Sequence, residues 1–139
     1  KTKAENLERT KTICPYCGVG CGIHLLTEDG KLMGTEPDFD APSRGSLCVK
    51  GQFASWEFVK SDERLKYPLI RENDAFRRAS WDEALDLVAS RLSGIRDETG
   101  PDSIVCWSSA RTVTEANYLM QKFTRIGIGT NNIDNCSRT

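Results

Sequence analysis

Residues 14–21 read CPYCGVGC, and residues 47–51 read LCVKG. Together they place cysteines in the pattern C-x2-C-x3-C, followed after 26 residues by Cys48. Three thiolates in one compact loop and a fourth from a distant segment are a usual way to hold a cubane iron–sulfur cluster, with one sulfur on each iron. Glycines within the loop let the backbone curl around a bulky inorganic core without Cβ clashes. The pattern therefore predicts metal ligands at Cys14, Cys17, Cys21 and Cys48.

Two other uses of clustered cysteines have to be weighed. Structural zinc sites usually join two C-x2-C pairs, whereas the split here is three and one, so the spacing favours iron and sulfide over zinc. Disulfides are the least favoured, because six cysteines in 139 residues are fewer than a disulfide-stapled small domain carries. Cys106 and Cys136 stand apart. We expect Cys106 to be a small buried hydrophobe and assign no role to Cys136. His24, the only histidine, is expected at an exposed strand position.

Charge and hydropathy argue against two kinds of partner. The 19 basic and 20 acidic residues are well mixed and give a net charge of -1, whereas a nucleic-acid-binding chain would show a basic excess on some segment. No stretch approaches the roughly 18 consecutive apolar residues that a membrane-spanning helix needs. We therefore expect a cytoplasmic protein. The chain begins with Lys1, so the sequence is also compatible with an export signal that has been removed.

The first half of the chain is expected to form a small, loop-rich β module. Residues 1–11 are polar and predict a linker. Asp29-Gly30 lies between short apolar stretches and predicts a β-hairpin, because such turns need a residue that accepts positive φ. Prolines then break regular structure before Cys48. We assign residues 12–66 to this module, which would be marginally stable without a metal.

The second half carries the local signals of helices and a strand. Residues 80–83 read SWDE, a capping box that starts a helix, and Gly100-Pro101 ends that helix. The apolar run over residues 103–107 predicts a strand. A second helix is expected from Thr114, with Glu115 near its positive end.

Both helices have an apolar stripe that we expect to face a core. The stripe residues are Trp81, Leu85, Val88, Leu92 and Ile95 in the first helix, and Ala116, Leu119, Met120, Phe123 and Ile126 in the second. One strand and two helices cannot cover both faces of a sheet. Residues 67–139 are therefore interpreted as the first segment of an incomplete α/β domain, and the whole chain as α+β.

The motifs resemble those of a known family. CPYCGVGC at 14–21 together with LCVKG at 47–51 is similar to the N-terminal cluster-binding domain of the molybdopterin oxidoreductases. The similarity extends from about residue 12 to the end, through SWDEAL at 80–85 and GPDSI at 100–104. Two later stretches, SSAR at 108–111 and GTNNID at 129–134, resemble the formate dehydrogenases of this family more than its nitrate reductases.

The resemblance implies a formate dehydrogenase catalytic subunit, which oxidises formate to carbon dioxide or catalyses the reverse reaction. It implies two cofactors: a 4Fe-4S cluster on the four cysteines and bis-molybdopterin guanine dinucleotide with molybdenum or tungsten. Lys50 would contact both the cluster and the pterin. Electrons would leave through a partner subunit that carries an iron–sulfur or flavin group.

The same resemblance assigns further residues to the pterin site. Ser109 and Arg111 lie after the predicted strand and before the second helix, where open α/β sheets bind nucleotides, and a guanidinium can grip phosphate bidentately. Asn132 and Asp134, in the segment that leads to the family's metal ligand, are also expected to bind this cofactor. Arg138 is expected to hold formate or to shape the pterin pocket.

In the family, the residue after the position of Thr139 is a selenocysteine or cysteine that ligates the metal, and a catalytic histidine follows. We expect selenocysteine at that place, because its codon doubles as a stop codon, and we expect the 139 residues alone to be inactive. The alternatives are a nitrate reductase, a relative from an NADH-oxidising complex, and a non-catalytic electron-transfer or zinc-binding module.

Overall fold

The computed structural model describes residues 7–54 and 57–136, and the chain divides into two compact units. The first unit contains the residues before Leu65 together with Ser109–Asn117 and Cys136. The second unit contains Leu65–Ser108 and Tyr118–Asn135. The chain contains both helices and small, separate sheets, so the α+β prediction is confirmed. In the described ranges, none of the helices has both the length and the apolar character that a membrane span requires.

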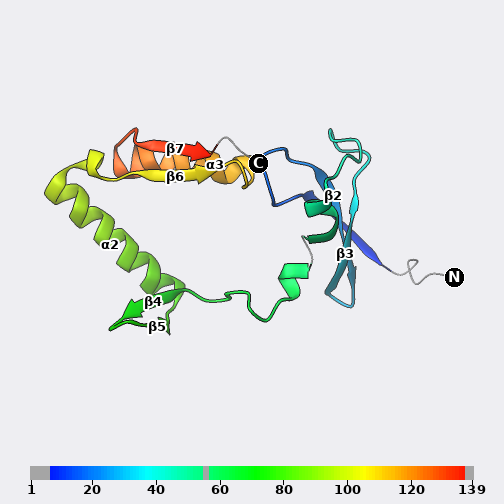
Figure 1. Ribbon diagram of the computed structural model, residues 1–139, viewed down its shortest axis with the longest axis horizontal. Coiled ribbons are helices and arrows are strands. Elements are labelled where there is room, and N and C mark those ends of the chain that lie inside the picture. Colours follow the sequence, from blue (N-terminus) through cyan, green and yellow to red (C-terminus); the bar gives the residue numbers. More distant parts are fainter. Residues whose placement is uncertain (1–6, 55–56, 137–139) are drawn as a thin grey trace. The chain divides into compact units, whose positions relative to one another are not determined.

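The first unit is built on a three-stranded antiparallel sheet with the order β1-β2-β3 (Figure 1). The strands are β1 (Glu8–Ile13), β2 (Gly22–Glu28) and β3 (Lys31–Pro37). The predicted hairpin is confirmed, because Asp29 and Gly30 join β2 to β3 with φ values of 50° and 72°. The predicted linker is wrong for residues 8–11, which form most of β1. Pairing with β2 along the whole strand outweighs their polar composition.

The segment after β3 contains the fourth cysteine, and the residues that follow this cysteine are hydrogen-bonded to β3. The Thr35 hydroxyl of β3 donates to the carbonyl oxygens of Gly51 and Gln52 at 2.9 and 3.1 Å. These bonds hold a short π-helical segment, η2 (Lys50–Ala54), against the sheet, and a 3-10 turn, η3 (Phe58–Lys60), follows. The buried centre of this unit is small and consists of Cys14, Ile23, Asp38 and Ala41.

The second unit begins with a hairpin and a long helix. Strands β4 (Leu69–Glu72) and β5 (Ala75–Arg78) pair antiparallel across Asn73-Asp74, both with positive φ, and no sequence prediction covered this hairpin. Helix α2 (Trp81–Thr99) begins as predicted, with the Ser80 hydroxyl accepting from the Glu83 amide at 3.1 Å. It ends as predicted at Gly100, which has a φ of 85°.

The remainder of the second half alternates strand and helix. Strand β6 (Cys106–Ser109) lies three residues later than predicted, because Pro101–Ser103 form a 3-10 turn (η4). Helix α3 (Thr114–Lys122) starts at the predicted residue and continues as a π-helical segment, η5 (Phe123–Ile128). Strand β7 (Ile133–Cys136), for which the sequence analysis predicted no strand, pairs with β6, and the arrows of the two strands point the same way in Figure 1.

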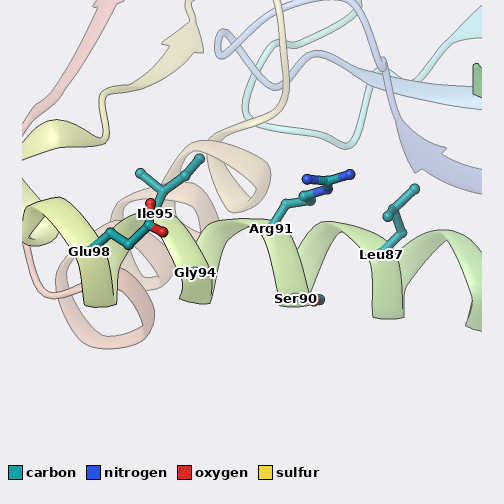
Figure 2. Close-up of a pocket in the computed structure, with 6 residues that line it drawn as sticks. All are labelled: Leu87, Ser90, Arg91, Gly94, Ile95 and Glu98. Carbon is teal, nitrogen blue, oxygen red and sulfur yellow. The ribbon is translucent and has the colours of Figure 1, made fainter.

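The apolar stripes of the helices are exposed, which corrects the prediction that they face a core. Trp81 and Leu85 of α2 are 65% and 59% exposed, and Ile126 after α3 is 75% exposed. The physical reason is that η5 meets only the last part of α2, near Leu92 and Arg96. Figure 2 shows a hollow that is lined by another set of residues, all from α2 (Leu87, Ser90, Arg91, Gly94, Ile95 and Glu98).

Candidate metal centre and cofactor-binding loops

Three of the predicted metal ligands lie in the loop that joins β1 to β2. The Cys14 amide donates to the Cys21 carbonyl at 2.8 Å and closes the loop at its base. Gly20 has a φ of 71°, so the chain reverses just before Cys21 at a residue that accepts this backbone conformation. Cys14 is buried, and Cys17 is partly exposed.

The fourth predicted ligand, Cys48, begins the segment that β3 holds in place. An ideal Cβ on Gly51 would lie 3.0 Å from Cys14 Sγ and 2.5 Å from Leu47 Cδ1. Only a glycine allows the backbone after Cys48 to approach Cys14 this closely. The fold thereby brings the remote cysteine segment to the base of the cysteine loop.

The environment of two thiols differs. Burial raises the pKa of the Cys14 thiol, the Tyr16 amide acts in the opposite direction, and the thiols of Cys21, Cys17 and Cys48 add smaller increases. These last contributions come from thiols in the surroundings of Cys14.

The pKa of Cys48 is instead lowered, because the amides of Gly51 and Lys50 donate to its sulfur and the Lys50 ammonium lies nearby. A thiolate is the form that binds metal, so this backbone prepares Cys48 as a ligand.

The donor set fits an iron–sulfur cluster. All six cysteines are free of disulfides, so the four thiols are available as ligands. Among the described residues, no three cysteine, histidine or carboxylate side chains are arranged to hold a single metal ion. In a cubane each thiolate binds a different iron, so four thiols match the four irons of one cluster. Backbone amides directed at thiolates are a feature of such sites.

The cysteine loop contacts the loop between β6 and α3, where two of the predicted pterin-binding residues lie. The Gly18 amide donates to the Ala110 carbonyl at 3.1 Å, and the Thr114 hydroxyl donates to the Gly18 carbonyl at 3.3 Å. All of these residues belong to the first unit. Ser109 and Arg111, predicted from the sequence, therefore stand in a segment held directly against the cysteine loop.

Ser109 is fixed by several contacts. Asn117 Oδ1 accepts a hydrogen bond from the Ser109 amide at 3.3 Å, and Asn117 Nδ2 donates one to the Ser109 carbonyl at 3.0 Å. The Ser109 hydroxyl accepts from the Arg111 amide at 3.1 Å. These bonds turn the backbone so that Arg111 is exposed at the tip of the loop.

The other predicted cofactor residues lie outside the loop between β6 and α3. The Asn132 side chain donates to the Asp102 carbonyl at 2.8 Å, which ties the start of β7 to the 3-10 turn after α2. Asp134 is exposed, and its carboxylate accepts from the Asn135 amide. Lys50 is exposed at the start of η2, beside Cys48. Arg138 lies outside the described residues.

Two interactions were missed from the sequence, and the burial of two further residues differs from what was expected. The Cys136 sulfur lies 3.3 Å from both the Ser109 hydroxyl and the Ala110 amide, so it supports the same loop. Asp38 is a buried carboxylate paired with Lys11. His24 is only partly exposed, with Nδ1 buried and without a hydrogen-bond partner, and Cys106 is partly rather than fully buried. The sequence around Asp38 gave no sign that this residue is buried, because its burial depends on long-range packing.

Two family models match the chain, and together they cover nearly all of it. The model described as the molybdopterin oxidoreductase Fe4S4 domain matches residues 7–61. The model described as molybdopterin oxidoreductase matches residues 64–139. The boundary between the two matches falls next to the boundary between the two structural units at Arg64.

Similar curated proteins are much longer than this chain. YjgC of Bacillus subtilis strain 168, provisionally named an oxidoreductase, is 50% identical over 135 residues, which are 96% of this chain and 14% of YjgC. A provisionally named formate dehydrogenase of Staphylococcus aureus strain USA300 is 44% identical over 137 residues, which are 98% of this chain and 14% of the relative. The chain thus spans about 14% of the length of these relatives.

The fold is also similar to those of solved structures, among them an acetylene hydratase. Acetylene hydratase from Pelobacter acetylenicus matches with a TM-score of 0.68 and 26% sequence identity. The match covers 90% of this chain and 18% of the hydratase chain.

Proposed function

The chain belongs to the molybdopterin oxidoreductase family, and from this membership we propose that it is the amino-terminal part of a formate dehydrogenase catalytic subunit. The proposal is supported by the name of the S. aureus relative and by the SSAR and GTNNID stretches. Because the chain spans about 14% of such relatives, the activity is proposed for the whole protein to which these residues belong.

Most of the residues proposed to hold the cofactors lie in the first unit, and two further ones, Asn132 and Asp134, lie in the second. Cys14, Cys17, Cys21 and Cys48 would bind the four irons of the cluster. The cluster supplies one-electron transfer, and a molybdenum or tungsten ion on bis-molybdopterin guanine dinucleotide supplies the two-electron oxidation of formate. Lys50 is proposed to neutralise negative charge between the two groups, and it already lies beside the Cys48 sulfur.

Arg111 and Ser109 are proposed to bind the pterin dinucleotide from the loop between β6 and α3. Arg111 is exposed there and can donate to phosphate bidentately, while the Ser109 backbone is held by Asn117. Asn132 and Asp134 are also proposed to bind the dinucleotide, and Arg138 to orient formate. The metal ligand after Thr139 is proposed to be selenocysteine or cysteine, and reading the gene beyond this point decides which.

The observation that carries the proposal is the contact between the cysteine loop and the Ser109–Thr114 segment. Gly18, between two cluster ligands, exchanges hydrogen bonds with Ala110 and Thr114 on either side of Arg111. A cofactor bound at Arg111 would therefore lie close to the cluster, as electron transfer between them requires. An electron-transfer partner subunit with an iron–sulfur or flavin group, and a cytoplasmic location, are further parts of this proposal.

The test is substrate specificity of the complete purified protein. We expect formate-dependent reduction of an artificial dye, with little activity on nitrate. A second reaction, acetylene hydration, is included because one solved structure with a similar fold is an acetylene hydratase. Activity with nitrate or acetylene but none with formate would overturn the formate dehydrogenase assignment and leave the family membership intact.

A further inference from the structure

Asp38 is a buried carboxylate in the unit that contains the cysteines. Its side chain is 1% exposed, and an unpaired buried charge is costly. Its charge is balanced by Lys11, whose Nζ lies 2.8 Å from Asp38 Oδ2. Oδ1 accepts from the Asp40 amide at 2.9 Å.

The backbone of Asp38 connects segments that carry different cysteines. Its amide donates to the Gly22 carbonyl at 3.1 Å, and Gly22 directly follows Cys21. Its carbonyl accepts from the Gly45 amide at 3.1 Å, and Gly45 leads to Cys48. The Asp38 side chain forms an ion pair with Lys11 of β1, the strand that ends just before Cys14. One residue therefore links all three segments that supply the predicted ligands.

The carboxylate also lies close to Gly22, the residue that follows Cys21. An ideal Cβ on Gly22 would be 3.3 Å from Asp38 Oδ2, so the charged oxygen packs against the residue next to Cys21. The Lys11 ammonium holds the pKa of Asp38 below its usual value, so the carboxylate is ionised at neutral pH. The other titratable groups that act on this pair are His24 and Asp40.

We propose that Asp38 is a positioning residue for the cysteine set, and that the Lys11–Asp38 ion pair sets the reduction potential of the cluster. This inference rests on the proposed cluster at the four cysteines. A fixed negative charge beside a cluster opposes the arrival of an electron, and a fixed positive charge favours it. Neutralising Asp38 should therefore raise the potential, and neutralising Lys11 should lower it.

The two effects should differ in size. Loss of the buried Asp38 charge is expected to change the ratio of reduced to oxidised cluster at a fixed applied potential by about tenfold, or about 59 mV for a one-electron couple. Lys11 is 59% exposed, so solvent screens its charge and the opposite shift should be smaller. The double variant should return towards the wild-type potential.

The experiment is a redox titration, followed by electron paramagnetic resonance, of the full chain after anaerobic reconstitution with iron and sulfide. The variants are D38N, which keeps the shape and the acceptor for Asp40, K11Q, and K11Q/D38N. The matched control is D74N, which removes the same charge from the exposed Arg71–Asp74 pair of the β4–β5 turn. We expect a higher potential in D38N, a lower one in K11Q, and no change in D74N.

A purely structural role predicts something different. Both single variants would then lose iron, and their potentials would stay unchanged or move in the same direction, which would overturn the inference. If D38N fails to fold, K11Q decides the question when it is measured at alkaline pH, where the Asp38 carboxylate stays ionised without its partner. If the wild-type chain forms no cluster at all, the proposed cluster assignment falls as well, so the two failures are distinguishable.

Discussion

The cysteine-bearing unit buries its central side chains, whereas the second unit leaves its long apolar stripe exposed. Ile23 and Asp38 are 0% and 1% exposed, and Trp81 and Leu85 are 65% and 59% exposed. The first unit is held by hydrogen bonds between distant loops, whereas both ends of α2 in the second unit are fixed by hydrogen bonds between sequence neighbours. A change in the first unit should therefore alter the metal site, while a change in the second should alter helix stability only.

Loss of a predicted ligand should have the largest effect. Cys48→Ser replaces a thiolate that two backbone amides stabilise with a hydroxyl that binds iron weakly. We expect the reconstituted chain to lose most of its iron and its visible absorption. Cys106→Ser in the second unit is the control and should retain the cluster. Equal iron content in the two variants would mean that Cys48 is not a ligand.

A smaller effect is expected from Gly51→Ala. The added Cβ would lie 2.5 Å from Leu47 Cδ1 and 3.0 Å from Cys14 Sγ, so the Cys48 segment must move away from Cys14. We expect a loss of about 1–3 kcal/mol in the free energy of unfolding, measured by chemical denaturation, together with reduced iron uptake.

The matched control for this change lies in α2. A Cβ on Gly94 would meet nothing within 4 Å, so Gly94→Ala should stabilise the helix by about 0.5–1 kcal/mol and leave iron uptake unchanged. Equal effects of the two glycine substitutions would show that close approach at Gly51 has no special importance.

The capping of α2 should matter for stability but not for metal. Ser80→Ala removes the acceptor for the Glu83 amide and is expected to cost about 1 kcal/mol of stability, measured by thermal or chemical unfolding. Ser90→Ala, at an exposed position within the same helix, is the control and should change stability by less than about 0.5 kcal/mol. A loss of iron in Ser80→Ala would contradict the expectation that changes in the second unit leave the metal site unaffected.

The smallest effect is a pH dependence in the second unit. The Arg77 guanidinium holds the pKa of Glu83 below its usual value, and the Ser80 amide adds a smaller contribution. Stability from this carboxylate is therefore fully present above the usual glutamate pKa and is lost as the pH falls through the lowered folded value. Because both side chains are nearly half exposed, the effect should be small.

The check is the difference in Tm between the wild type and Glu83→Gln from neutral to acidic pH. The wild type should be slightly more stable near pH 7, and the difference should vanish well below about pH 4.3, the usual glutamate pKa. A difference that is independent of pH would show that ionisation of Glu83 is not responsible.

Elements with a local signal could be predicted from the sequence. Asp29-Gly30 and the residues around Ser80 specify a turn and a helix start through their own backbone, and Thr114 begins the second helix as expected. Asn73-Asp74 is a turn of the same backbone type, so its hairpin was open to the same argument but was not predicted. In each case the deciding contacts lie within a few residues.

Features that depend on distant contacts could not be predicted in this way. Residues 8–11 are polar, and only their pairing with β2 makes them a strand. The burial of Asp38 arises from Lys11 and from the loop after β3, and the exposure of the α2 stripe follows from which elements pack against it. For the candidate site, spacing predicted the four ligands, but the contact of Gly18 with Ala110 and Thr114 required the fold.

The most direct measurement is the iron, zinc and acid-labile sulfide content of the full chain after anaerobic reconstitution. Our account predicts about four irons and four sulfides per chain, with a visible absorption that bleaches on reduction with dithionite. A colourless protein that binds one zinc per chain, or one with disulfides among Cys14, Cys17, Cys21 and Cys48, would contradict it.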